Sequence, residues 1–206
     1  MQTKRAARAL CLGAAFSVLL PVVADAQVTR FYDPSTRSFL TYDPAPRRSW
    51  SVPAEFRRQI VPFPTEEAPG TIIIDSASKH LYFVLAGGEA IRYGIGVGRE
   101  GFGWHGVVRV GAKAEWPTWT PPSEMIAREP TLAQYSGGMP GGPDNPLGAR
   151  ALYLFDGGRD TMYRIHGTNE PWTIGHNVSS GCIRMMNHDV MELHYLAKVG
   201  AKVIVR

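Results

Sequence analysis

From residue 70 onward, short runs of β-branched and aromatic residues alternate with turn residues, which is the pattern of a β-rich domain. Such runs occupy residues 71–75, 80–85 and 90–97. The turn Ala86-Gly87-Gly88-Glu89 predicts that the last two runs form a hairpin. Further strands are expected at residues 105–110, 151–155, 162–166 and 201–205. Asn187 is suited to cap a helix that runs to about Val199 and is closed by Gly200. The pattern predicts one mostly β domain with one or two short helices.

The first residues have a different pattern, that of a secretory signal peptide. Three basic residues precede an apolar stretch from Ala9 to Val23, and Ala24-Asp25-Ala26 then gives the small-x-small cleavage pattern. We therefore expect residues 1–26 to be a signal peptide and the protein to be exported to the periplasm or cell envelope. An uncleaved anchor is the alternative, but the stretch is short for a membrane span and contains Pro21. Residues 27–69, rich in Pro and aromatic side chains, are interpreted as an N-terminal arm.

Composition narrows the possible partners and cofactors. Removing residues 1–26 takes away three basic residues and one acidic residue, so the net charge falls from +4 to about +2. The remaining chain has no basic block, which excludes electrostatic recognition of nucleic acid. Gly94, Gly96 and Gly98 alternate along a predicted strand with no helix after them, so they do not form a dinucleotide fingerprint. No P-loop is present, and no cofactor is expected.

Cys182 is the single cysteine left after removal of the signal peptide. An unpaired thiol in an exported protein is exposed to oxidation, so its presence favours a chemical role over a buried structural one. Cys182 follows the turn Ser179-Ser180-Gly181, where backbone N–H groups converge and Gly181 allows a substrate carbonyl to approach closely. Together with the positive charge of Arg184, this environment predicts an activated nucleophile with an oxyanion hole.

A nucleophilic cysteine needs a base within hydrogen-bonding reach. His166 ends a predicted strand, and the loop that follows it is long enough to bring it back to Cys182. His176 is closer in sequence but lies in a predicted loop, so we favour His166, because rigid elements position catalytic groups better. A zinc site built from Cys182, His166 and His176 is a further alternative, which the absence of closely spaced ligand pairs disfavours.

Two runs of this chain are His166-Gly167-Thr168-Asn169-Glu170-Pro171-Trp172 and Ser179-Ser180-Gly181-Cys182-Ile183-Arg184-Met185. Together they resemble the signature of the YkuD-type L,D-transpeptidases, in the ErfK/YbiS-like branch. The resemblance covers about residues 70–206 and implies a YkuD-type β-sandwich or barrel-like catalytic domain. It implies Cys182 as nucleophile, His166 as general acid/base, and the Gly167 backbone carbonyl as the group that orients His166. Where the family often has His before the Gly-Cys pair, this chain has Ser180, which excludes a base at that position.

The resemblance also implies a substrate class. The donor would be a peptidoglycan stem tetrapeptide that forms a thioester with Cys182. The acceptor would be a second stem peptide, an envelope protein or water, so 3→3 cross-linking, protein anchoring and hydrolysis all stay open. A non-catalytic wall-binding module is the remaining alternative. Arg184 is interpreted either as a ligand for a substrate carboxylate or as half of a structural ion pair.

Overall fold

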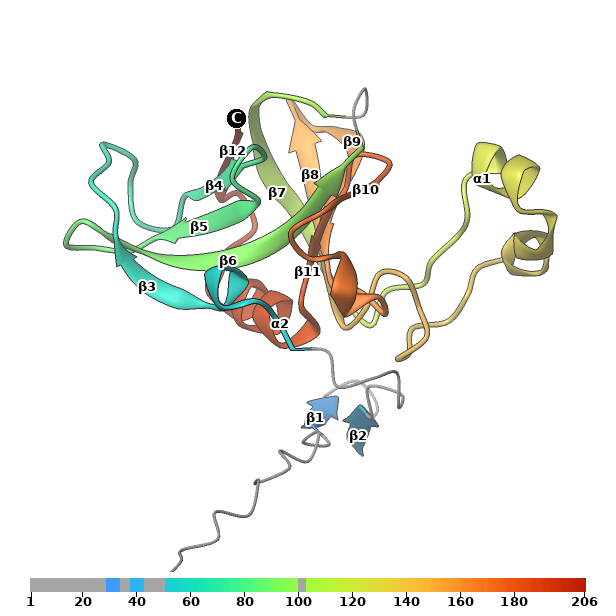
Figure 1. Ribbon diagram of the computed structural model, residues 1–206. Helices are drawn as coiled ribbons and strands as arrows, with labels where there is room; N and C mark the ends of the chain where they lie inside the picture. Colours follow the sequence, from blue (N-terminus) through green and yellow to red (C-terminus); the bar gives the residue numbers. More distant parts are fainter. Residues whose placement is uncertain (1–28, 34–37, 43–50, 100–102) are drawn as a thin grey trace, which may run out of the picture.

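The computed structural model describes residues 29–33, 38–42, 51–99 and 103–206 (Figure 1). The predicted signal peptide lies outside the described residues. The strands are β1 (Thr29–Asp33), β2 (Ser38–Tyr42), β3 (Gln59–Pro62), β4 (Ile72–Asp75), β5 (His80–Val84), β6 (Glu89–Gly98), β7 (Gly106–Glu115), β8 (Arg150–Asp156), β9 (Arg159–His166), β10 (Asn177–Ser179), β11 (Ile183–Met185) and β12 (Lys202–Val205). The helices are α1 (Ser123–Arg128) and α2 (Asn187–Leu196), with 3₁₀ turns η1 (Ala54–Phe56), η2 (Pro130–Tyr135) and η3 (Pro171–Thr173).

Eight strands close into a barrel-like ring in the order β6-β11-β9-β8-β7-β12-β4-β5. The ring closes because β5 also pairs with β6, which is the hairpin predicted from Ala86-Gly87-Gly88-Glu89. β3 and β10 pair with β6 outside this ring, and β1 and β2 form a separate two-stranded sheet. A closed sheet leaves no ring strand with an unpaired edge. The prediction of a mostly β, barrel-like fold is confirmed.

The core follows the two-residue period of the strands. In β8, Leu152 and Leu154 are fully buried, and Ile165 of β9 and Ile183 of β11 continue the same layer. Side chains of the remaining ring strands complete it, among them Ile72, Ile74, Leu81, Tyr93, Ile95, Val110 and Val203. Each fully buried Leu or Ile contributes roughly 1.5–3 kcal/mol, so this interior holds the barrel together. The opposite face of β8, β9, β11 and β6 is here called the outer face.

α2 adds Val190 and Leu193 to the core, and it begins differently from the prediction. The residue in the N-cap position is Met186, without a side-chain hydrogen bond, and the helix ends at Leu196 rather than Val199. The Asn187 side chain instead bonds to two distant loops. The prediction that Asn187 caps the helix is therefore wrong. No helix in the described part of the chain is long and apolar enough to cross a membrane.

Part of the N-terminal arm is hydrogen-bonded to the barrel. β3 pairs antiparallel with β6, and the Phe63 ring stacks on Tyr82 with centroids 4.5 Å apart. Arg58 makes two hydrogen bonds to the Glu192 carboxylate on α2, at 3.0 and 3.1 Å. The buried Tyr93 hydroxyl donates to the same carboxylate at 2.9 Å. The arm from about η1 onward is thus fixed to both the sheet and α2.

The long segment between β7 and β8 extends away from the barrel and carries α1 and η2 (Figure 1). Its base is closed by a bridge between Trp119 and Met139 and by the fully buried Asn145. The Asn145 amide nitrogen donates to the carbonyls of Pro117, Met139 and Pro140 at 3.0–3.1 Å. The Gly- and Pro-rich residues 136–148 are therefore an ordered loop, with Asn145 holding its base.

Candidate active site on the outer face

Three of the predicted site residues lie together on the outer face of β9 and β11. These strands pair in parallel, with Ile183 opposite Ile165 and Arg184 opposite His166. Since Ile165 and Ile183 point into the core, their neighbours point outward, and Cys182, directly before β11, lies on the same face as Arg184. His166 and Cys182 are therefore diagonal neighbours across one strand pair. His176, the rival base, is exposed in the loop after η3.

The His166 ring is held by the backbone next to it. Its Nδ1 lies 2.5 Å from the Gly167 carbonyl oxygen. A carbonyl only accepts hydrogen bonds, so Nδ1 carries the proton and Nε2 is the basic nitrogen. The pKa of His166 is lowered to about 4, first by burial, then by the Arg184 charge and more weakly by the Arg164 charge. The hydrogen bond to Gly167 raises this pKa, but by less than the Arg184 charge lowers it. The resting imidazole is therefore neutral, with Nε2 as its unprotonated nitrogen.

The turn before Cys182 is tied together by Ser179. The Ser179 hydroxyl donates to the Cys182 carbonyl at 2.6 Å and accepts from the Gly181 N–H at 3.1 Å. Gly181 has φ +111°, a conformation that L side chains rarely adopt, which explains glycine at this position. The Gly181 N–H is thus engaged within the turn, so the Gly181 donor predicted for an oxyanion hole is occupied in this conformation.

Cys182 is a free thiol of intermediate exposure. Burial raises its pKa, while the Arg164 backbone and the charges of Arg164 and Arg184 act in the opposite direction. The same two guanidinium groups also act on His166, which agrees with the shared face of the four residues. A resting pair of neutral thiol and neutral imidazole follows, in which the thiolate forms when the proton moves to His166.

Arg184 forms an ion pair with Glu170, with Nη1 and Oε2 2.8 Å apart. Of the two interpretations of Arg184, the ion pair is the one the structure contains. Glu170 belongs to the loop that follows His166, so the pair fastens this loop to β11. Within the described residues, Arg184 Nε is buried without a hydrogen-bond partner, which leaves one donor of the guanidinium unused.

Asn187 is the residue of this region whose role the sequence did not reveal. Its Oδ1 accepts from the backbone N–H groups of Ala149 and Thr168 at 3.0 and 3.1 Å, and its Nδ2 donates to the Thr168 carbonyl at 3.0 Å. A Cβ on Gly167 would overlap with Asn187 Oδ1. Asn187 therefore fixes the backbone on which Gly167 presents its carbonyl to His166. Its position directly before the predicted helix suggested only a cap.

The alternating glycines of β6 also have a structural explanation. A Cβ on Gly96, opposite Arg184, would lie 2.8 Å from the Thr173 carbonyl oxygen of η3. A Cβ on Gly94 would lie 2.5 Å from Phe56 of η1. Both distances are shorter than real Cβ contacts, so the absent side chains let η1 and η3 lie directly on the outer face.

Other aromatic and loop residues lie in the segments that follow His166 and that connect β7 to β8. Trp172 of η3 is 38% exposed, in the loop between His166 and Cys182. Trp119 and Tyr135 contact each other in the extended segment, with ring centroids 6.5 Å apart. The Asp144 carbonyl accepts from the Asn169 side chain at 2.9 Å, which joins the Gly/Pro loop to the loop after His166. Among the residues described, no group of three or more His, Cys, Asp or Glu side chains is placed to hold a metal ion.

Comparisons with known proteins identify relatives of the domain. The family model described as the L,D-transpeptidase catalytic domain, YkuD, matches residues 69–205. A probable L,D-transpeptidase YbiS of Escherichia coli K12 is 39% identical over 142 residues, covering 64% of this chain and 43% of the relative. The probable L,D-transpeptidase ErfK/SrfK of the same organism is 37% identical over 141 residues, covering 64% and 42%. The chain thus spans less than half the length of these two relatives.

A solved structure is also similar. A crystal structure from Brucella melitensis, described as a probable carnitine operon oxidoreductase caia, is 48% identical, with a TM-score of 0.52 over 75% of this chain and 96% of that one. The two catalytic-site runs resembled the ErfK/YbiS-like branch, and the family model and the two Escherichia coli relatives confirm that resemblance.

Proposed function

Because the chain belongs to the YkuD family of L,D-transpeptidase catalytic domains, we propose that it transfers acyl groups of peptidoglycan stem peptides through a thioester on Cys182. The observation that carries the proposal is the arrangement on the outer face. A partly exposed thiol lies diagonal to a buried neutral imidazole, and the Nδ1 of that imidazole is bonded to the Gly167 carbonyl. This is the nucleophile, base and orienting group that an acyl transfer needs.

The first half-reaction forms the thioester. The Cys182 thiol gives its proton to His166 Nε2, and the sulfur attacks the carbonyl carbon between diaminopimelate and the terminal D-Ala of the donor tetrapeptide. The carbon–nitrogen bond then breaks, and His166 passes the proton to the leaving D-Ala amine. The imidazolium exists only during this step, because burial and Arg184 disfavour it at rest.

The second half-reaction releases the acyl group to an acceptor. His166 takes a proton from the acceptor amine, the amine attacks the thioester, and Cys182 recovers a proton as the carbon–sulfur bond breaks. A second stem peptide gives a 3→3 cross-link, an envelope-protein amine gives anchoring, and water gives a carboxypeptidase. Arg184, whose side chain is 19% exposed, is the proposed contact for a carboxylate of the substrate. The oxyanion donor in this scheme is the N–H of Cys182 itself, supported by the turn at Gly181.

Export to the cell envelope is part of the proposal, since peptidoglycan is assembled outside the cytoplasmic membrane. It is supported by the basic, apolar and small-residue pattern of residues 1–26. No metal or cofactor takes part in the proposed reaction.

The test is to incubate the purified protein with a disaccharide-tetrapeptide donor and to read the products by mass spectrometry, with Cys182→Ala as the control. Release of D-Ala with a cross-linked dimer is expected for transfer, and a tripeptide alone would indicate hydrolysis. Absence of both products with this donor would contradict the proposal. A carbapenem adduct on Cys182 separates an enzyme from a wall-binding module, since a binder has no activated thiol. Loss of activity in His176→Ala but not in His166→Ala would contradict the choice of base.

A further inference from the structure

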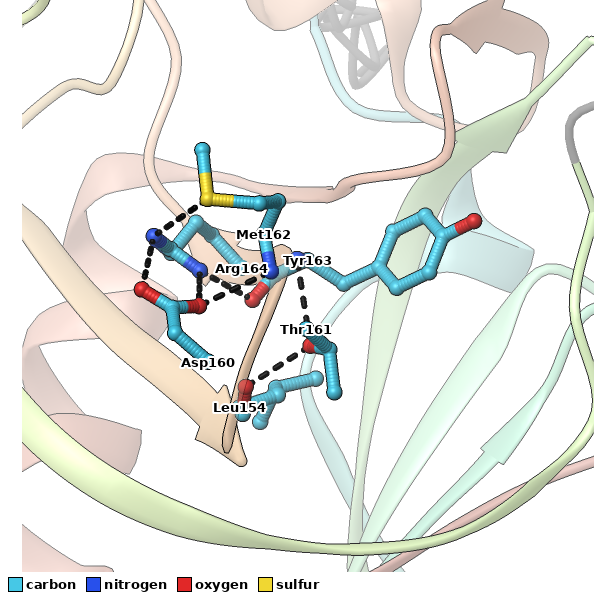
Figure 2. Close-up of polar contacts among 6 residues, drawn as sticks. All are labelled: Leu154, Asp160, Thr161, Met162, Tyr163 and Arg164. Atoms are coloured by element: carbon cyan, nitrogen blue, oxygen red, sulfur yellow. Dashed lines mark hydrogen bonds and ion pairs between the residues drawn. The ribbon is translucent and has the colours of Figure 1, made fainter. Parts of the chain in front are cut away.

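The β8–β9 hairpin is irregular directly before the candidate site. Tyr153 pairs with Arg164 and Phe155 with Asp160, so one residue of β8 faces three residues of β9. At the centre of this bulge, Met162 has φ +64°, unusual for a residue with a side chain, and 73% of its surface is exposed. Thr161 fixes the bulge, because its hydroxyl donates to the Leu154 carbonyl at 2.7 Å (Figure 2). Bulges beside active sites commonly redirect a side chain.

The side chain that this bulge redirects is that of Arg164. In a regular strand, residues four apart are separated by roughly 13 Å, too far for a direct ion pair. Here the Asp160 carboxylate accepts from both amino nitrogens of Arg164, at 2.7 and 2.8 Å (Figure 2). The guanidinium carbon also lies 4.4 Å from the centre of the Tyr153 ring. Arg164 is therefore held by a carboxylate on one side and an aromatic face on another.

The register of β9 and β11 places the Arg164 backbone next to Cys182, and the Arg164 charge acts on that thiol. Ile165 lies opposite Ile183, so one residue earlier on each strand Arg164 is the neighbour of Cys182, as His166 is of Arg184. The Arg164 side chain is 12% exposed and that of Asp160 is 36% exposed. The ion pair thus has its positive end toward the protein and its negative end toward solvent.

We propose that the Asp160–Arg164 bulge fixes a positive charge beside Cys182, and that Arg164 is a positioning residue that favours the thiolate. Both amino nitrogens of Arg164 already bond to Asp160, and Nη1 also donates to the Tyr163 carbonyl, so Arg164 acts by its field and not as a ligand for substrate. Burial otherwise raises the pKa of this thiol. The inference takes Cys182 as the nucleophile of the proposed function, but its test needs no peptidoglycan.

The test is the rate of Cys182 alkylation by iodoacetamide, a neutral reagent, as a function of pH. Peptide mapping reads Cys182 separately from Cys11. Arg164→Gln is expected to slow alkylation at pH 8 by roughly 5- to 10-fold and to leave the limiting rate at high pH unchanged. Arg164→Lys should recover part of the rate, because it restores the charge but not the two-point contact with Asp160. Arg159→Gln, at an exposed position of the same strand, is the matched control and should change nothing.

Asp160→Asn gives a second test with the opposite sign. The amide keeps an oxygen for Arg164 and for the Met162 N–H but removes the negative charge, so alkylation at pH 8 should become faster. If Arg164→Gln leaves the pH profile unchanged, or both variants slow alkylation alike, Arg164 has only a structural role and the inference is wrong. Near-UV circular dichroism shows whether each variant is folded. If Arg164→Gln is not folded, the alkylation rates of Asp160→Asn and Arg164→Lys decide whether the inference holds. A protein that shows these shifts but transfers no stem peptide would contradict the proposed function and leave this inference intact.

Discussion

His166 and Arg184 face each other directly across the parallel strands β9 and β11, with Cys182 two residues before Arg184 on the same face. A buried imidazole opposite a guanidinium cannot easily take up a proton from solvent. Most of the chemistry expected of this site follows from that pairing.

The first prediction concerns the protonation of His166. Burial and the Arg184 charge lower its pKa to about 4, so its imidazole signals should titrate near pH 4 in an NMR experiment. In Arg184→Gln the midpoint should move upward but stay below 6.5, because burial is the larger cause. A midpoint near 6.5 in the unaltered protein would show that the ring is solvated.

The same low pKa makes stability depend on pH. Between pH 6.5 and 4 the unfolded chain binds a proton at His166 that the folded protein does not, so the free energy of unfolding falls as the pH falls. The loss attributable to this group is roughly 3 kcal/mol by pH 4. Urea unfolding at several pH values should give a shallower dependence in His166→Gln than in the unaltered protein.

The second prediction tests the turn that presents Cys182. Ser179→Ala removes the hydrogen bonds to the Cys182 carbonyl and the Gly181 N–H, so the turn loses its internal support. We expect acylation of Cys182 by a carbapenem to slow by roughly 10- to 100-fold, at a cost in stability of about 1–2 kcal/mol. Ser180→Ala, at the exposed neighbouring position, is the control and should acylate normally. Equal rates in the two variants would mean that Ser179 does not position the thiol.

The third prediction concerns Asn187, which joins the loops at Ala149 and Thr168. Asn187→Ala leaves two buried N–H groups and one carbonyl without their partner, and should lower the free energy of unfolding by roughly 3–5 kcal/mol. Tyr195→Ala, on the same helix and 85% exposed, should change stability by less than about 1 kcal/mol. Chemical denaturation measures both. Similar values for the two variants would contradict the role assigned to Asn187.

The fourth prediction uses the Glu192 carboxylate, which accepts from Tyr93 and Arg58. Burial raises the pKa of Glu192, but the hydrogen bonds from Arg58 and Tyr93 outweigh it and the net pKa is lowered. Glu192→Ala leaves the buried Tyr93 hydroxyl without this acceptor and should cost about 2–3 kcal/mol, whereas Tyr93→Phe removes the hydroxyl and should cost roughly 1 kcal/mol. Thermal melts of both variants show which one loses more stability. A larger loss in Tyr93→Phe than in Glu192→Ala would show that the hydrogen bonds to Glu192 do not stabilise the fold.

The sequence predicted the regular strands well and the short ones poorly. Residues 71–75 and 90–97 are recognisable because their β-branched and aromatic residues continue for a whole strand. β10 and β11 have three residues each and contain Asn, Ser and Arg, so no local pattern marks them. They form because β6 and β9 offer them backbone partners, which is a non-local property.

The sequence predicted the reacting residues of the candidate site, but not the residues that hold them in place. His166 and Cys182 were identified by residue type and neighbouring sequence, without knowledge of β11. The roles of Asn187 and Gly96 depend on segments that are remote in sequence, Ala149 and Thr173 respectively, so no local signal reveals them. The Asp160–Arg164 pair was equally hidden, because the spacing of the two residues in a regular strand separates them.

The position of β12 in the ring determines when the barrel is completed during synthesis. β12 lies between β7 and β4, antiparallel to the first and parallel to the second. Until Lys202–Val205 have left the ribosome, β4 and β7 cannot be joined, and the ring stays open at that seam. Strand pairs of such large sequence separation form slowly. Because β12 is the last of the ring strands along the chain, a nascent chain cannot close the barrel until residues 202–205 have been made, and a truncation before Lys202 would leave β4 and β7 with unpaired edges.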